Sequence, residues 1–258
     1  MNETLEVIER RRSTRAYADA PLNREEKDLI LHAAMRAPTA GNMMLYSIIE
    51  VEDQALKDRL AVTCDDQPFI TRAPYLLLFL ADYQRWMDYY EYCGAEEFAL
   101  KMGLTPRKPG AGDLLLACCD ALIAAQTAVI AAESLGIGSC YIGDILENYE
   151  IHREMFNLPP YVIPITLVCF GRPQKEHRRE DQSSRFDREF IVSQNRDRRL
   201  SGGDFARMYR HIEERIAAGK GYSSGAKNHG QATYLRKFIA DFSVEMNRSV
   251  REMLKNWE

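Results

Sequence analysis

Three arginines and two hydroxyl residues stand within five positions near the start of the chain, in the segment RRSTR at positions 11–15. The arginines at 10–12 end a predicted helix, and a cation at a helix C-terminus is favourable by about 0.3–1 kcal/mol. Capping of that kind does not require the further Arg15 together with Ser13 and Thr14. The segment therefore has the donors of an anion-binding site, and a solvated basic helix end is the simpler alternative.

A glycine-rich segment follows the most apolar part of the chain. GIGSCYIG, at positions 136–143, comes directly after a long apolar run. A dinucleotide-binding fingerprint follows a strand and opens a helix, whereas these glycines follow a predicted helix and lack the G-x-G-x-x-G spacing. Glycines here would let the backbone approach a flat or bulky group closely. A helix end that leads into a strand explains the segment equally well.

Several kinds of catalytic site are excluded because their motifs are missing. The five histidines are scattered without metal-ligand spacing, so we expect no dedicated metal site. The sequence has neither a G-x-S-x-G nucleophile elbow nor a G-x-x-x-x-G-K-[ST] phosphate loop. Cys118 and Cys119 are adjacent, but we expect both to pack inertly inside a buried helix. A bound cofactor that brings its own chemistry is therefore the favoured source of reactivity.

The composition is typical of a globular protein with a substantial core. Of the 258 residues, 46% are hydrophobic and 28% are charged, so disorder is not expected. The net charge of −4 argues against general binding to nucleic acid or to acidic membrane lipids. The six cysteines form no C-x-x-C pair, and the first residues have no signal-peptide pattern, so we expect a cytoplasmic protein with free thiols.

The apolar run that begins at Asp113 organises the predicted fold. Alanine, leucine and glutamine favour a helix there, and Gly136 supplies its end. Asp120 and Gln126 interrupt the run, and an acidic residue at the centre of a membrane helix costs about 2.5–3.5 kcal/mol, so a membrane span is disfavoured. A helix that is apolar almost all round is expected in a core or at a subunit interface.

Two apolar segments predict the main strands of a sheet. Positions 75–81 contain no polar residue, which is typical of a strand buried on both faces. Positions 161–170 predict a second strand, in which Pro164 argues for an edge position or a bulge. A shorter strand is expected at 47–51 and an extended piece at 190–192. Helices are expected at 4–12, 23–36, 53–63, 147–157, 205–217 and 232–257, and an aromatic-rich helix at 82–102 is expected to be half-buried or to wall a ligand pocket.

Five separated segments together resemble the FMN-dependent nitroreductase family. In chain order they are RRSTR, APTAGN at 37–42, Gln67 with the Ala-Pro-strand-Asp pattern after it, the central helix ending in ESLGIGSCYIGDI, and YVIPITLVCFGRP. The resemblance implies an α+β fold with a mixed, mainly antiparallel central sheet flanked by helices. It also implies an FMN-binding domain at 1–200 and a C-terminal helical extension at 201–258 that docks on the body or on the partner subunit.

The resemblance further implies which residues bind FMN. The RRSTR segment would meet the phosphate, the ribityl chain and the pyrimidine edge of the ring, and the APTAGN loop would approach from the neighbouring subunit. Gln67 would suit a ring edge that presents both N–H and C=O, and the glycine-rich segment would lie against the ring near N5. The implied FMN ligands are Arg11, Arg12, Ser13, Arg15, Pro38, Thr39, Asn42, Gln67, Tyr141, Ile142, Gly143 and Arg185.

Two places depart from the family pattern. Ser183 stands where a lysine usually precedes Arg185, so the phosphate site would draw on Arg178 or Arg179, or on no further cation. The residues at 44–45 are Met-Leu, where relatives often carry Gln-Pro. The second departure bears on the choice of electron acceptor and not on the binding of FMN.

The implied protein is a homodimeric oxidoreductase in which FMN carries the chemistry and no side chain is a dedicated catalyst. NAD(P)H would reduce FMN in a ping-pong sequence, and a nitroaromatic, quinone or similar electron-poor acceptor would then be reduced. The central helices would pack together in the dimer. Two alternatives stay open: other flavin chemistry on the same fold, such as dehalogenation or flavin fragmentation, and a non-catalytic flavin-binding redox sensor.

Overall fold

The structure, a computed structural model, describes residues 2–175, 183–219, 221–222 and 225–258. The chain divides into two compact units. We call Met1–Arg179 with Glu245–Glu258 the main unit, and Glu180–Val244 the extension unit. The predicted domain boundary at residue 200 stays a prediction.

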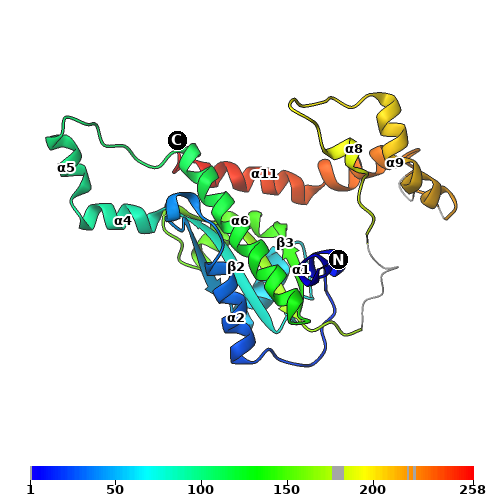
Figure 1. Cartoon of the computed structure of the whole chain (residues 1–258), viewed down its shortest axis with the longest axis horizontal. Helices are drawn as coiled ribbons and strands as arrows, with labels where there is room; N and C mark the ends of the chain where they lie inside the picture. Colours follow the sequence, from blue (N-terminus) through cyan, green and yellow to red (C-terminus); the bar gives the residue numbers. More distant parts are fainter. Residues whose placement is uncertain (1, 176–182, 220, 223–224) are drawn as a thin grey trace. The chain divides into compact units, whose positions relative to one another are not determined.

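The main unit is built on an antiparallel sheet of four strands in the described part of the chain, in the order β1-β2-β4-β3 (Figure 1). This confirms the predicted α+β fold with a mainly antiparallel sheet. An isolated parallel bridge between Ser13 and Ser139 adds to the β3 edge. The strands are β1 (Tyr46–Glu50), β2 (Tyr75–Asp82), β3 (Gly138–Ile142) and β4 (Val162–Gly171). The helices and 3-10 turns of this unit are α1 (Glu3–Arg10), α2 (Arg24–Met35), η1 (Ala40–Asn42), α3 (Gln54–Thr63), α4 (Gln84–Tyr92), α5 (Ala95–Lys101), α6 (Ala111–Ser134), η2 (Gly143–Leu146) and α7 (Tyr149–Met155).

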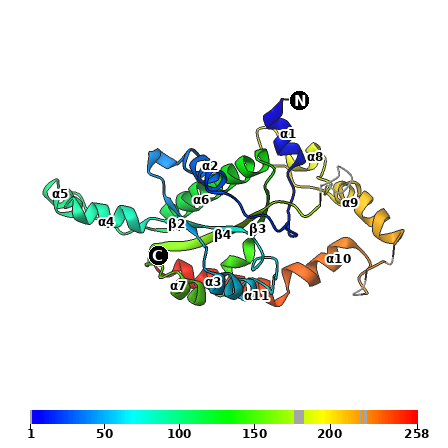
Figure 2. The ribbon, with the colours of Figure 1, turned by 90° about the horizontal axis from the view of Figure 1, so that it is seen from below.

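Strand β2 is buried on both faces, as its continuous apolar sequence predicted. Its odd-numbered residues, Tyr75 to Phe79, pack in one cluster with α2 and α6, whereas its even-numbered residues, Leu76 to Leu80, pack in a second cluster with α3. Figure 2 shows α2 and α6 on one side of the sheet and α3 and α7 on the other. The alternation of side chains along a strand therefore supplies both layers of the core.

Pro164 lies at a bulge in a central strand. Phe79 pairs with Thr166 and Leu80 pairs with Pro164, so Ile165 is an extra residue on β4. The predicted bulge is confirmed, and the alternative of an edge strand is wrong, because β4 lies between β2 and β3. The bulge relieves the ladder where proline has no N–H to donate.

Helix α6 presents two different apolar faces. Its sheet-facing side is buried and consists mainly of alanines. On the other side Leu115, Leu116, Leu122 and Ile123 are 40–67% exposed, and Cys119 is exposed as well. We call these five residues the α6 stripe. Among the described helices α6 alone has the length and composition of a membrane span, and 44% of its most apolar window is buried inside the fold.

The aromatic-rich segment at 82–102 forms two helices, so the prediction of a single helix is wrong, whereas Trp86 and Tyr90 are half-buried as predicted. Gly94 separates α4 from α5 with a φ of 62°, a backbone conformation that favours glycine. Neither helix has a buried residue, and both project from the sheet (Figure 1). The base of this arm is fixed because Trp86 Nε1 donates to the carbonyl oxygen of Met43 at 2.8 Å.

The extension unit is helical. Its elements are α8 (Arg188–Ile191), α9 (Gly202–Ala217), α10 (His229–Thr233) and the π-helical turn η4 (Tyr234–Phe238). The prediction of an extended piece at 190–192 is wrong, since α8 reaches Ile191 and Val192 caps it. The predicted single helix at 232–257 is broken before α11 (Asp241–Leu254).

The last residues of the chain are anchored in the main unit. Trp257 is 1% exposed and packs edge-on against Tyr83 and Tyr161. Arg248 donates to both carboxylate oxygens of Glu150 at 2.7 Å. The end of α11 therefore docks on the body of the fold.

Candidate functional site

The RRSTR segment lies along the outer edge of β3. The backbone N–H of Thr14 donates to the carbonyl oxygen of Ser139 at 2.8 Å, and Ser13 bridges Ser139 in parallel register. This edge is available because β3 is the last strand of the sheet. The predicted anion-binding segment thus borders the predicted ring-binding strand.

Close packing at Gly138 fixes the position of this segment. Thr14 is 1% exposed, and a Cβ added to Gly138 would lie 2.2 Å from Thr14 Oγ1. The sequence suggested that these glycines admit a flat ligand. At Gly138 the space admits a side chain of the RRSTR segment instead. Gly136, with a φ of 72°, provides the turn that ends α6.

Arg11 and Arg15 are free to meet an anion. Among the described residues neither arginine forms an ion pair, whereas Arg10 lies 3.6 Å from the Glu133 carboxylate. The Arg15 guanidinium lies 5.8 Å from the centre of the Phe69 ring, a cation–π contact that restricts its side chain. Both cations lie in the segment that the sequence assigned to the phosphate.

The three residues at the end of β3, Tyr141 to Gly143, differ in what they can offer to a ligand. Tyr141 donates its hydroxyl to Gln126 Oε1 at 3.2 Å, and burial raises the pKa of Tyr141 to about 12 although Arg11 opposes the shift. Ile142 is 1% exposed and packs on the α3 side of the sheet, so its side chain does not face a ligand. Gly143 is exposed, and no described atom lies within 4 Å of the place of its missing Cβ. A flat group can therefore reach the backbone at Gly143.

Gln67 is tied to the same end of β3. Its Nε2 donates to the carbonyl oxygen of Cys64 and to Asp144 Oδ2, each at 2.8 Å. Asp144 directly follows Gly143, so Gln67 is a neighbour of the exposed glycine. Both amide hydrogens are used within the protein, which leaves the carbonyl oxygen for a ligand. The predicted double role of donor and acceptor is thus reduced to that of an acceptor.

The APTAGN loop is held by a carboxylate of α6. Asp120 is 2% exposed and accepts hydrogen bonds from the backbone N–H groups of Ala40 and Leu45, each at 3.0 Å. Thr39 Oγ1 accepts from the N–H of Met44 at 3.1 Å. Within the loop Pro38 and Asn42 are exposed and Thr39 is half-buried. At the two departing positions 44–45, only the methionine is partly accessible, because the leucine is 1% exposed.

Within one chain, α6 separates this loop from the RRSTR segment. Asp120 holds the loop, and the carbonyl oxygen of Glu133 accepts from Arg10 at 2.8 Å, 13 residues further along the same helix. A rise of 1.5 Å per residue places these two contacts about 20 Å apart along α6. Within one chain, the loop and the residue before the RRSTR segment therefore contact α6 at well separated points.

Arg185 belongs to the extension unit. It is exposed, and its Nη1 donates to the backbone oxygen of Ser183 at 3.2 Å. The alternative phosphate ligands Arg178 and Arg179 lie outside the described residues.

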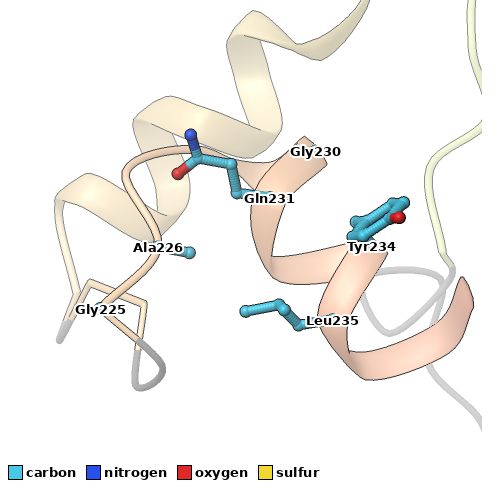
Figure 3. Close-up of a pocket in the computed structure, with 6 residues that line it drawn as sticks. All are labelled: Gly225, Ala226, Gly230, Gln231, Tyr234 and Leu235. Atoms are coloured by element: carbon cyan, nitrogen blue, oxygen red, sulfur yellow. The ribbon is translucent and has the colours of Figure 1, made fainter. Parts of the chain in front are cut away.

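A separate hollow lies within the extension unit (Figure 3). It has a volume of about 520 Å³ and is formed by the start of α10, the turn η4 and the preceding loop. None of its described lining residues is charged or is a predicted FMN ligand, so it offers no counter-ion for a phosphate. These residues are Gly225, Ala226, Gly230, Gln231, Tyr234 and Leu235.

The residues at the end of β3 fit FMN by their chemistry. A phosphate requires cationic donors, which Arg11 and Arg15 supply. A flat ring requires an unobstructed backbone, which Gly143 supplies, and a ring N–H requires an acceptor, which Gln67 supplies. Sequence reasoning did not identify Asp144 as the residue that orients this amide. Its position next to Gly143 was the one available signal.

Comparisons with known proteins find a matching family and several relatives. A family model described as "Nitroreductase family" matches residues 8–172. An FMN reductase [NAD(P)H] from Bacillus subtilis is 35% identical over 173 residues, 67% of each protein. An oxygen-insensitive NADPH nitroreductase from Salmonella typhimurium is 29% identical over 214 residues, 83% of this chain and 82% of that one. Among solved structures, B. megaterium NfrA1 matches 98% of both chains with a TM-score of 0.79 and 26% identity.

Proposed function

This chain belongs to the nitroreductase family, and from that premise we propose which of its residues hold FMN and what the site reduces. The protein is an oxidoreductase that uses NAD(P)H and the cofactor FMN. When bound, FMN supplies the hydride and electron transfer. The chain has to bind the cofactor, orient it and leave room for the two substrates in turn.

We assign the phosphate and ribityl end of FMN to the segment at 11–15. The single observation that carries this assignment is the position of Arg11 and Arg15 on the β3 edge, without an ion pair among the described residues. The exposed Ser13 adds a hydroxyl, and Arg12 adds a third cation in the same segment. Arg185 is proposed as a further cation, on the resemblance to the family.

The isoalloxazine ring is assigned to the end of β3. Gly143 leaves its backbone open to a flat group, Tyr141 borders it, and Ile142 contributes its backbone alone. Gln67 offers its carbonyl oxygen to a ring N–H. An arginine of the RRSTR segment, at the pyrimidine edge, stabilises the negative charge of the reduced ring.

We propose that the active protein is a homodimer in which the APTAGN loop of one subunit completes the site of the other. Two observations support this. The α6 stripe exposes five apolar residues at helical spacing, which is typical of a surface that packs against a partner. Within one chain, the α6 contacts of Arg10, just before the RRSTR segment, and of Ala40, in the loop, lie about 20 Å apart along the helix.

The proposed acceptors are nitroaromatics, quinones and similar electron-poor molecules that stack on the open face of the ring. Dehalogenation or flavin fragmentation on the same fold is the alternative chemistry. We also propose a cytoplasmic location, because all six cysteines, each within the described residues, are free thiols.

The test is turnover by FMN-loaded protein with NADH or NADPH and a panel of acceptors. We expect oxidation of the nicotinamide to depend on both FMN and an added nitroaromatic or quinone. Product analysis with reduced protein and a halogenated acceptor separates the alternative chemistry. Tight FMN binding without reduction by either nicotinamide would contradict the proposal and favour a redox sensor.

A further inference from the structure

A buried carboxylate stands three residues beyond the partner of Gln67. Asp144 accepts the amide N–H of Gln67 at 2.8 Å, and Glu147 follows at the end of the turn η2. Glu147 is 5% exposed, and its Oε1 has no hydrogen-bond partner among the described residues. A charged oxygen in that position would lose its hydration without receiving a donor in exchange.

The groups around Glu147 are mainly acidic. Asp144 of η2, Asp65 after α3 and Glu245 of α11 all act on it, and burial together with these carboxylates raises the pKa of Glu147 from its usual value near 4.5 to about 7. Among these carboxylates Asp144 has the largest effect on the pKa of Glu147, and it lies three residues earlier in the same turn. Among the described residues no lysine or arginine pairs with Glu147, Asp144 or Asp65, whereas Glu245 pairs with Arg248 at 2.8 Å.

Two other titratable side chains near Glu147, those of His152 and Cys64, are neutral near pH 7. Burial lowers the pKa of His152, whose Nδ1 donates to the carbonyl oxygen of Ile145 at 3.0 Å. Burial raises the pKa of the Cys64 thiol. The charge of this cluster therefore changes near neutral pH through Glu147.

We infer that Glu147 is a positioning residue for Gln67 and acts through Asp144. A protonated Glu147 can donate a hydrogen bond to Asp144 while Asp144 accepts from the Gln67 amide. An ionised Glu147 repels Asp144, so the carboxylate that fixes Gln67 is displaced. The inference rests on the proposed function, in which the Gln67 carbonyl oxygen accepts from the flavin ring.

Two consequences follow for FMN binding. The affinity falls as pH rises through the ionisation of Glu147, by about fivefold if one hydrogen bond to the ring is lost. By linkage, FMN binding must also favour the protonated form, so the protein takes up protons when FMN binds near neutral pH. Neither effect arises from a purely structural role of Glu147.

The experiment is a titration of apoprotein with FMN, followed by flavin fluorescence, between about pH 6 and pH 8. We expect the wild type to bind about fivefold more weakly at the upper end. Glu147→Gln cannot ionise but can donate to Asp144, so it should keep the low-pH affinity throughout. Glu154→Gln, which removes an exposed carboxylate on α7, is the control with the same charge change and should behave as the wild type.

The FMN phosphate itself titrates near pH 6, but it contributes equally to all variants, so the comparison with Glu154→Gln removes it. Asp144→Asn, which keeps an acceptor for Gln67 and removes one charge, should also flatten the pH dependence. Calorimetry in buffers of different ionisation enthalpy should show proton uptake in the wild type that Glu147→Gln lacks.

The inference is overturned if Glu147→Gln follows the pH dependence of the wild type, provided that thermal unfolding shows both to be folded. It is also overturned if the wild type binds FMN with no such dependence, in which case the proposed function stands. A wild type that binds no FMN at any pH overturns both.

Discussion

Thr14 occupies the space that a side chain at Gly138 would need, since a Cβ there would lie 2.2 Å from Thr14 Oγ1. We therefore predict that Gly138→Ala displaces the RRSTR segment from the β3 edge and weakens FMN binding at least about tenfold, the loss of one charge-assisted contact. FMN titration of the folded variant measures the effect.

Gly112→Ala is the matched control for this substitution. Gly112 lies in α6, and no described atom lies within 4 Å of the place of its missing Cβ. Alanine favours a helix there, so FMN affinity should not change. Equal FMN affinities of Gly138→Ala and Gly112→Ala would contradict the role given to Thr14.

Arg15→Ala should weaken FMN binding by about 1.5–3 kcal/mol, or about tenfold to a hundredfold, because a charged hydrogen bond to the phosphate is removed. The affinity should also become less sensitive to salt. Arg24→Ala removes an arginine whose side chain is 89% exposed and paired with Asp28, and should leave affinity unchanged. If Arg15→Ala retains FMN like Arg24→Ala, the assignment of the phosphate to this segment is wrong.

Asp120→Asn should lower the free energy of unfolding by about 1–3 kcal/mol, because an amide offers one acceptor oxygen where two backbone N–H groups now donate. FMN affinity should fall as well, through the loosened APTAGN loop. Urea denaturation and FMN titration measure the two effects. Asp88→Asn on the exposed helix α4 is the control. A stable Asp120→Asn protein with a normal affinity would show that the loop needs no such anchor.

The stability of the apoprotein should respond to Glu147 with a defined sign. Its carboxyl group has a pKa raised from about 4.5 to about 7, so the folded protein binds the proton more tightly than the unfolded chain. Stability is therefore lost as pH rises from 4.5 to 7, by at most about 3 kcal/mol for this group. Urea denaturation at about pH 5 and about pH 8 should find that Glu147→Gln gains stability over the wild type only at the higher pH.

The contribution of Glu150 to stability should depend on pH in the opposite direction. Arg248 holds the pKa of Glu150 down at about 2, so its charge stabilises the fold above its usual pKa and that contribution disappears as pH falls. Glu150→Gln should therefore lose stability relative to the wild type at the higher pH. The same trend for both variants would contradict the environments described here.

Mixed dimers can test whether two chains build one site. Arg15→Ala should damage the segment on one subunit, and Asn42→Gly should remove a loop side chain while it keeps the positive φ of 57°. In a dimer of one chain of each kind, one site has both defects and the other has none. Mixing the two variants should therefore restore tight FMN binding. No restoration would argue that each site is built within one chain.

The sequence predicted the layers of the fold because local patterns carry that information. The uninterrupted apolar residues of β2 and the glycine stop after α6 both led to correct elements. Gly94 divides the aromatic-rich helix through its left-handed backbone, which the periodicity of neighbouring side chains did not reveal. The helical α8 was predicted as extended because four residues are too few for a helical pattern.

The residue types of the candidate site could be proposed from the sequence, but the contacts between them could not. The arginines of the RRSTR segment and the exposed Gly143 were recognisable along the chain. The bond between Gln67 and Asp144 joins residues 77 positions apart, and no local pattern encodes such a pair. Asp120 was interpreted as an argument against a membrane helix, whereas its carboxylate anchors a loop 75 to 80 residues away.

The most direct measurement is of the flavin itself. Purified protein incubated with FMN and passed through a desalting column should be yellow, with flavin absorbance that corresponds to one FMN per chain. Anaerobic addition of NADPH or NADH should bleach that absorbance, and a nitroaromatic or quinone should restore it. Protein that leaves the column colourless, or flavin that neither nicotinamide bleaches, would contradict the account.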